Sequence, residues 1–204
     1  MAKENPKPME GEKNVTEVSL KEQLESYLLP EMDLVINSLE NKKEMIFTII
    51  PELKAEEGFE HKHPHHAYDV WKHTLVAMER SKPDLQVRLA LLLHDIGKPY
   101  CYQEEGNMRH FRGHPKKSEE MTKVILTRLG YSPKEIADIC YLVENHDTII
   151  NINKVEEHNR ALIEKQLHMQ YCDAYAHHPD HIEKRIKKLN QIKKRLEERV
   201  EEGR

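Results

Sequence analysis

Apolar residues recur every three or four positions along most of this chain, which is the spacing of helices that bury one face. Residues 1 to about 15 depart from this pattern, since they are polar and rich in Pro, Lys, Glu and Asn, and we expect a disordered tail there. Over residues 16–59 the pattern predicts three short helices, the first capped by Thr16, with breaks at Pro30 and Pro51. Nothing in these helices suggests chemistry, and we interpret them as accessory structure.

The most apolar predicted helix ends on an adjacent histidine and aspartate. It is expected to start after Asp84 and to run through a series of leucines to His94 and Asp95, before Gly97 and Pro99 stop it. A buried imidazole and a buried carboxylate are costly unless something compensates them. A divalent cation would do so, because both groups are good ligands for first-row metal ions. The search for a functional site therefore starts at this pair.

Further helices are expected on both sides of this segment. Residues 99–117 are predicted to form a loop, with a short hairpin around Gly106 and Asn107. The apolar periodicity places other helices at about 67–81, 115–130, 133–146 and 155–177. The fold class predicted from the sequence is therefore all-α, a multi-helix bundle.

A narrow apolar stripe flanked by Lys, Arg and Glu runs through residues 181–204 and predicts a charged amphipathic helix. Two interpretations of this helix are open. It either packs against the rest of the domain or associates with a helix of another molecule, as in a homodimer.

Composition narrows the classes of protein that fit. The 204 residues suit one domain, and the scarcity of glycine, 7 residues, favours helices. A net charge of −4 excludes a globally basic nucleic-acid binder, although not a local basic face. Three widely spaced cysteines fit neither a disulfide framework nor a thiolate zinc site. The polar N-terminus and the lack of a long apolar run predict a cytoplasmic protein without a membrane segment.

The 14 histidines exceed what a core needs, and metal binding is one reason for such an excess. Several of them, together with one distant aspartate, fall on apolar faces or at the ends of predicted helices. Each alone is weak evidence, because a lone histidine on an apolar face is more often an ordinary core residue. Together, spread over several helices, they form a candidate metal site: His73, the pair His94 and Asp95, His114, His146 and Asp173.

Several short motifs surround these residues. They are Asp69–Leu75, the His-Pro-His-His stretch from His63 to His66, Leu-Leu-His-Asp-Ile-Gly-Lys-Pro at 92–99, His-Phe-x-Gly-His at 110–114, Glu-Asn-His at 144–146 and Asp173–Pro179. With them, residues 60–180 resemble the HD domain superfamily of metal-dependent phosphohydrolases, and most of all the HD domain of bacterial tRNA nucleotidyltransferases. The nucleotide-adding head is not expected, because no Gly-Ser motif with paired aspartates precedes this region.

The resemblance implies a specific set of ligands. His73, His94, Asp95 and Asp173 would hold the principal divalent ion, which could be Mn, Fe, Ni, Co, Mg or Zn. His114 and His146 correspond to histidines that hold a second ion in two-metal members, bridged by Asp95. The family usually has Glu after the histidine at 114, where this chain has Pro-Lys-Lys, so one ion and two ions both stay open. The remaining nearby histidines are expected to be loop or supporting residues: His61, His63, His65, His66, His110 and His177.

The chemistry that such a ligand set implies is hydrolysis, because a divalent ion with open positions activates water and stabilises charge on a phosphoryl oxygen. Asp95 or Asp173 would align the water. A phosphate also needs cations to hold it, and we expect Lys98 to take that role first, with Arg109 and Arg112 as further candidates.

Three functions are therefore weighed. The leading hypothesis is a phosphohydrolase acting on a nucleotide, a cyclic phosphate or another small phosphorylated substrate. The second is a di-iron oxygenase on the same scaffold. The third is a non-catalytic, metal-bearing module that binds a nucleotide or RNA, with the basic last helix as its contact surface.

Overall fold

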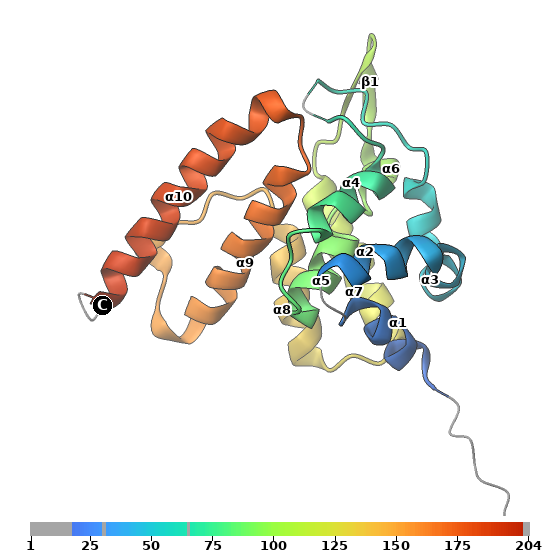
Figure 1. Ribbon diagram of the computed structural model, residues 1–204, viewed down its shortest axis with the longest axis horizontal. Coiled ribbons are helices and arrows are strands. Elements are labelled where there is room, and N and C mark those ends of the chain that lie inside the picture. Colours follow the sequence, from blue (N-terminus) through green and yellow to red (C-terminus); the bar gives the residue numbers. More distant parts are fainter. Residues whose placement is uncertain (1–17, 30–31, 65, 202–204) are drawn as a thin grey trace, which may run out of the picture.

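The computed structural model describes residues 18–29, 32–64 and 66–201, and Figure 1 shows the path of the chain. Within this part of the chain there are ten α-helices, two 3-10 segments and one two-stranded sheet. The prediction of an all-α protein is confirmed. The expected tail at 1–15 and the expected cap at Thr16 lie outside the described residues. No helix in the described ranges is both long and apolar enough to cross a membrane.

The N-terminal region contains the three expected helices, which are α1 (Leu20–Leu28), α2 (Met32–Asn41) and α3 (Lys43–Ile49), followed by a 3-10 segment at Pro51–Glu56. The start of α1 differs from the prediction, because its N-cap is Ser19. The Ser19 hydroxyl accepts a hydrogen bond from the Glu22 N–H, and the Glu22 carboxylate accepts one from the Ser19 N–H. This reciprocal pair gives a hydrogen-bond partner to two backbone N–H groups at the start of the helix.

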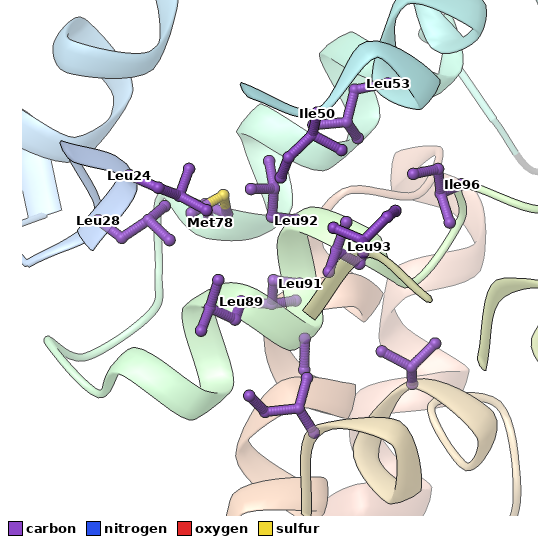
Figure 2. Packing of buried hydrophobic residues seen from close by; sticks show 14 of the residues in the cluster. Leu24, Leu28, Ile50, Leu53, Met78, Leu89, Leu91, Leu92, Leu93 and Ile96 are labelled. Carbon is purple, nitrogen blue, oxygen red and sulfur yellow. The ribbon is translucent and has the colours of Figure 1, made fainter. Parts of the chain in front are cut away.

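Helix α5 (Leu85–Leu93) lies at the centre of the hydrophobic core. The Asp84 side chain caps it by accepting a hydrogen bond from the Val87 N–H, as expected from the sequence. The leucines at 89, 91, 92 and 93 are fully buried and point toward different neighbours, which include α1 and the 3-10 segment (Figure 2). A mostly apolar helix with no solvent face belongs in the core. Even its arginine, Arg88, is fully buried and donates to the Leu28 carbonyl and to Ser81. Helix α4 (Val70–Met78), capped by Asp69, packs against it.

The end of α5 differs from the prediction in the roles of Gly97 and Pro99. The helix ends at Leu93, His94 is its C-cap, and a turn leads directly into the short helix α6 (Lys98–Cys101), with Pro99 in the first turn of α6. Gly97 has φ −79° and is therefore not a left-handed stop signal. A Cβ at Gly97 would lie 2.7 Å from the Ser118 backbone nitrogen, so glycine is needed here for the close approach of the next long helix.

The predicted hairpin is confirmed, with β1 (Gln103–Glu105) antiparallel to β2 (Met108–His110). Two long helices follow, α7 (His114–Arg128) and α8 (Pro133–Glu144), which pack against each other. The predicted cap Ser132 forms a capping box with Glu135 at the start of α8. Helix α8 also packs against α5, and α7 packs against α6, which follows α5 directly.

The last two helices form a hairpin. Helix α9 (Glu157–Tyr175) packs against α4, α5 and α8, and α10 (Pro179–Glu201) runs back along its outer side (Figure 1). A small second cluster of buried apolar residues, including Leu167, Leu189 and Leu196, joins α9 to α10. A 3-10 segment at Ile152–Lys154 also contacts α10. The last helix therefore packs on its own domain, which is one of the two interpretations left open above.

Candidate metal centre

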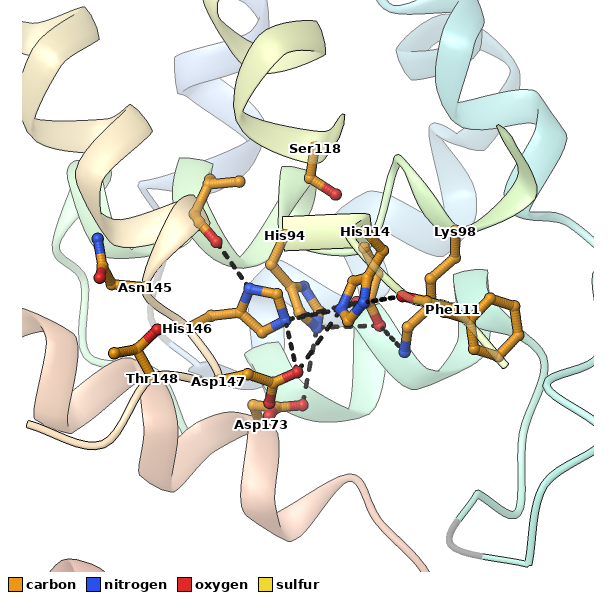
Figure 3. Close-up of polar contacts among 12 residues, drawn as sticks. His94, Lys98, Phe111, His114, Ser118, Asn145, His146, Asp147, Thr148 and Asp173 are labelled. Carbon is orange, nitrogen blue, oxygen red and sulfur yellow. Dashed lines mark hydrogen bonds and ion pairs between the residues drawn. The ribbon is translucent and has the colours of Figure 1, made fainter. Parts of the chain in front are cut away.

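Five helices or their ends bring the six candidate ligands to one place. Figure 3 shows four of them, His94, His114, His146 and Asp173, converging there. His73 lies on α4, His94 and Asp95 follow α5, His114 is the first residue of α7, His146 follows α8, and Asp173 lies near the end of α9. All six side chains are buried. The sequence separation of these residues reaches 100 positions, and the fold brings every predicted member of the set together.

The first group consists of His73, His94, Asp95 and Asp173. The possible ligand atoms of the first three lie within 4.8 Å of one another. The Nε2 atom of His94 is 3.3 Å from Asp95 Oδ2 and 3.7 Å from Asp173 Oδ1. His73 Nε2 is 2.9 Å from the same oxygen of Asp173. Two imidazole nitrogens and two carboxylate oxygens therefore converge on one point.

The second group shares Asp95 with the first. Its other oxygen, Oδ1, lies 3.3 Å from His114 Nε2 and 3.8 Å from His146 Nε2, and the two Nε2 atoms are 3.1 Å apart. Asp95, His114 and His146 form a set of possible ligand atoms within the same 4.8 Å limit. Each oxygen of Asp95 therefore faces a different pair of histidines, and the carboxylate is shared by the two groups.

Backbone carbonyls fix the orientation of all four histidines. In each ring Nδ1 lies within hydrogen-bond distance of a carbonyl oxygen, and since a carbonyl only accepts, Nδ1 carries the hydrogen. Nε2 is then left with its lone pair directed at the shared centre, as in metal-binding histidines held by an outer partner. The pairs are His73 with Ala176 at 3.2 Å, His94 with Leu91 at 2.7 Å, His114 with Phe111 at 2.9 Å, and His146 with Val143 at 2.7 Å.

The donor set fits a divalent cation. His94 Nε2 and Asp95 Oδ1 are buried and have no hydrogen-bond partner within the described part of the chain. A buried polar atom left in this state costs about 1–3 kcal/mol. Both atoms point into the two groups of imidazole and carboxylate donors, which is the mixture that first-row divalent ions prefer. A cation in the first group would satisfy His94 Nε2, and a cation in the second group would satisfy Asp95 Oδ1.

Burial and neighbouring charges shift the pKa of several candidate ligands. Although burial opposes it, His94 and Lys98 hold the pKa of Asp95 well below its usual range. Burial lowers the pKa of His73 to about 4, so this ring is neutral near pH 7. For His146, burial acts in the same direction, but Asp147 and Asp95 raise its pKa to about 9. Without metal, His146 therefore carries a proton that a metal ion must displace.

Lys98 is part of the centre and not a solvated lysine at a helix end. It is 5% exposed, and its Nζ lies 2.6 Å from Asp95 Oδ2. Its second partner is His61, whose Nε2 accepts from Nζ at 3.0 Å while its Nδ1 donates to the Tyr68 carbonyl. The ring of His66 stacks on His61 with centroids 3.7 Å apart. His61 thus positions the Lys98 ammonium directly, and His66 acts through its stacking on His61.

Two residues of the centre were not predicted from the sequence. Asp147 Oδ2 lies 3.4 Å from His146 Nε2, and Arg185 donates to both Asp173 Oδ2 at 2.6 Å and Asp147 Oδ1 at 3.2 Å. Asp147 had a usable signal, because the dipeptide His146-Asp147 repeats the His94-Asp95 pair at another helix end. Arg185 had none, since it is one of eight Lys and Arg residues between 179 and 201.

A cavity of about 400 Å³ opens over the ligands. All three predicted phosphate-binding residues line it, but in different states. The Arg109 guanidinium donates to Glu104 and to the Glu60 carbonyl, so it holds the hairpin in place. Arg112 is exposed and has no hydrogen bond or ion pair among the described residues. The other lining residues are His63, His66, Asp95, Lys98, His110, Phe111, His114, His146, Asp147, Asp173, His177 and Arg185.

The fold and this buried histidine and aspartate cluster define an HD domain, and a family model described as "HD domain" matches residues 64–202. The chain belongs to the HD domain family, which is part of the superfamily of metal-dependent phosphohydrolases. The predicted resemblance is confirmed by this match, which also extends over the last helix.

Two tRNA nucleotidyltransferases are similar to this chain. The A-adding tRNA nucleotidyltransferase of Deinococcus radiodurans is 35% identical over 104 residues, which cover 48% of this chain and 24% of that protein. The CC-adding tRNA nucleotidyltransferase of Thermus thermophilus is 31% identical over 121 residues, 55% of this chain and 26% of that protein. The chain thus matches only about a quarter of the length of each relative.

Proposed function

We propose that this protein is a metal-dependent phosphohydrolase that acts on a nucleotide, a cyclic phosphate or another small phosphoester. The observation that supports this most is the position of Asp95, between two histidine groups and at the floor of a cavity that also holds Lys98 and Arg112. Imidazole and carboxylate below the substrate, and cations beside it, suit a phosphoryl group that gains charge during hydrolysis.

Each side chain has a distinct role in this proposal. The two groups His73, His94, Asp95 and Asp173, and Asp95, His114 and His146, would hold one or two divalent ions. A bound ion would supply an activated water and a Lewis acid for the phosphoryl oxygens. The carboxylate of Asp95 or of Asp173 would align that water.

Lys98 and Arg112 are the proposed contacts to phosphate. The Lys98 ammonium has three hydrogens, and two of them are used by Asp95 and His61, so the third is available to a phosphoryl oxygen in the cavity. Arg112 lies at the cavity as an unpaired guanidinium and matches a phosphate edge with two parallel hydrogen bonds. Arg109 contributes less, because its hydrogens are already committed to the hairpin.

The direct test is metal analysis of protein purified without added metal, followed by assays against a broad panel of phosphoesters with Mn²⁺, Ni²⁺, Co²⁺ or Mg²⁺. We expect one or two ions per chain and turnover of at least one nucleotide or cyclic phosphate. Metal-bearing protein that hydrolyses no member of the panel would contradict the proposal. The di-iron oxygenase alternative uses the same bridging geometry at Asp95, and native iron with consumption of O₂ would favour it instead.

Asp95→Ala gives the sharpest single-residue test. The change removes the carboxylate common to both groups, so we expect metal content to fall and the rate of hydrolysis to drop by at least about a hundredfold. Helical content, measured by circular dichroism, should stay close to that of the wild type. Asp180→Ala, at an exposed aspartate of α10, is the control and should change neither quantity. Turnover retained in Asp95→Ala would exclude the proposed role of this residue.

A further inference from the structure

The charge on α10 is distributed unevenly. Residues 184–195 contain seven Lys and Arg and no Asp or Glu, in a chain whose net charge is −4. Only part of this charge is neutralised locally: Lys193 and Lys194 pair with Glu197 and Glu198 one turn further on. The middle of the last helix is therefore a basic surface on an acidic protein.

One side of α10 borders a second hollow, a groove of about 430 Å³. Lys188, Ile192 and Arg195 of α10 form one wall of this groove, and Ile149, in the segment after α8, is part of the other. Ile149 is 75% exposed, which is unusual for an isoleucine in a structure with a well-formed core. The groove therefore combines cations with exposed apolar surface.

This groove adjoins the cavity over the metal centre. Asp147 and Arg185 line both the groove and the cavity over the candidate ligands. Arg185, Lys188 and Arg195 are spaced by three and seven residues, so they lie on one side of the helix. At a rise of about 1.5 Å per residue, Arg195 is about 15 Å further along the helix axis than Arg185. The cations thus extend outward from the centre.

The cations of the groove differ in their availability. Arg185 is paired with Asp147 and Asp173. Lys188 and Arg195, in contrast, have no ion pair or hydrogen bond among the described residues, although acidic side chains neutralise other cations of α10. Two cations without a partner in the described part of the chain, beside the exposed Ile149 and the half-buried Ile192, are suited to a ligand that is repeatedly anionic and has flat apolar faces.

We propose that this groove binds the backbone of a single-stranded nucleic acid, so that the centre acts on the end of a polynucleotide and not on a free mononucleotide. The inference rests on the proposed phosphohydrolase function. A nucleic-acid strand carries one charge per about 3.4 Å in duplex geometry, so a stripe of about 15 Å faces several successive phosphates. Bases of the strand would pack on Ile149 and Ile192. An acidic peptide would match the cations but has no phosphoester to present to the centre.

Binding can be tested independently of metal and turnover. The probe is a 5′-fluorescein-labelled oligouridylate of eight nucleotides, titrated with the full chain and followed by fluorescence anisotropy at several salt concentrations. Lys188→Ala/Arg195→Ala should weaken binding about tenfold or more and reduce the slope of log Kd against log salt by about 1.4, two single-strand phosphate contacts. The matched control is Lys187→Ala/Lys194→Ala, with the same spacing on the other side of α10, where both residues border a different groove. The control should bind as the wild type does.

Turnover then tests the link to the centre. For oligonucleotides of one to eight nucleotides with the same terminal phosphoester, kcat/KM should rise with length in the wild type and in the control, and stay flat in Lys188→Ala/Arg195→Ala. The hydrolysis of p-nitrophenyl phosphate should be unchanged in both variants.

The outcomes separate the two proposals. Equal loss of binding in both double variants, or competition by polyglutamate as effective as that by unlabelled oligouridylate, would overturn the groove as a nucleic-acid site. A kcat/KM that does not change with oligonucleotide length would also overturn the groove as a nucleic-acid site. It would leave the proposed phosphohydrolase function standing. Groove-dependent binding without hydrolysis of any phosphoester would support the groove and overturn the proposed function.

Discussion

Asp95 connects the two halves of the candidate centre, because each of its oxygens faces a different pair of histidines. Its neighbours are not equivalent in their protonation. His73 is neutral near pH 7, whereas Asp147 and Asp95 hold a proton on His146 despite its burial. His73 of the first group can therefore bind an ion at neutral pH without losing a proton, whereas His146 of the second group must first release one.

This difference predicts a pH dependence of metal binding. Because the pKa of His146 is raised to about 9, the affinity of the second group should increase by about tenfold per pH unit between pH 7 and 9 and then level off. Isothermal titration calorimetry in buffers of different ionisation enthalpy would measure the released proton. In His146→Asn, the second binding event and its proton release should both disappear. A second affinity that is flat across this range would contradict the assignment.

Glu56 is a buried acid whose two carboxylate oxygens have no hydrogen-bond partner among the described residues. Burial, with a smaller contribution from Asp95, raises its pKa well above the usual range. A group with a raised pKa in the folded state contributes stability at low pH that is lost as the pH rises. Glu56→Gln should therefore stabilise the metal-free protein at pH 8 by on the order of 1–3 kcal/mol, with the gain vanishing near pH 4.

Urea unfolding at several pH values in the presence of a chelator would measure this effect. Glu57→Gln is the control, since Glu57 is exposed and pairs only with Lys43 at the surface. A change at Glu57 should stay within about 0.5 kcal/mol at every pH. Equal destabilisation by Glu56→Gln at pH 4 and pH 8 would show that Glu56 is not the titrating group.

At this scale the sequence predicted the six central side chains because their residue types are rare on apolar faces and because motifs surround them. Arg185 could not be predicted in this way. Its role follows from the direction of one side chain on a helix with many cations, and this depends on how α10 crosses the end of α9. Likewise, the sequence does not show that Arg109 is already hydrogen-bonded to Glu104 and Glu60, whereas Arg112 has no such partner among the described residues.

At the scale of elements, the contact between the turn after α5 and the start of α7 positions the second group. The Gly97 N–H donates to the Ser118 hydroxyl at 3.0 Å, and His114 begins α7 one turn before Ser118. The two carboxylate oxygens of Asp95 can face the two groups only while the backbone at Gly97 stays close to the start of α7.

Gly97→Ala tests that contact. The new Cβ would lie 2.7 Å from the Ser118 nitrogen and 3.0 Å from the His114 carbonyl oxygen, so α7 must move. We expect a loss of about 1–3 kcal/mol in the free energy of unfolding and weaker binding of the second ion, with the first retained. Gly130→Ala is the matched control: its φ of 81° makes alanine unfavourable by about 1–2 kcal/mol, but no atom lies nearby and metal content should not change. Loss of both ions in Gly97→Ala would argue against this separation.

Periodicity predicted the helices well and their ends less well. Ser132, Asp84 and the hairpin at Gly106 were found because capping and turn residues act locally. Gly97 and Pro99 were read as stop signals, whereas they start α6 and allow a close approach. A local pattern cannot distinguish a glycine that ends a helix from one that allows a close approach, because the close approach depends on α7, about twenty residues further along the chain.

At the scale of the whole molecule, the hairpin of α9 and α10 is joined to the main bundle both by packing of α9 and by Arg185. Arg185→Met would leave Asp173 and Asp147 without their cation. We expect the free energy of unfolding to fall by about 1–3 kcal/mol, less than for a fully buried pair because the arginine is partly exposed. Metal affinity should fall about tenfold or more.

Arg199→Met provides the comparison for this prediction. Arg199 also lies on α10, but it donates to the Ile152 carbonyl away from the centre. Its replacement should lower stability without changing metal affinity, as measured by competition with a chelating dye. If both variants lose metal equally, the hairpin acts through general stability and not through the contact of Arg185 with Asp173.

The partnership of His73 with Asp173 has a consequence for the protein in the cell. These residues are 100 positions apart, so an ion held by both would act as a removable crosslink around half of the chain. Closing so long a loop restricts the unfolded state in the way a disulfide does. Scarcity of the metal would then leave the protein not only inactive but also easier for proteases to open, which would couple its lifetime to the supply of the ion.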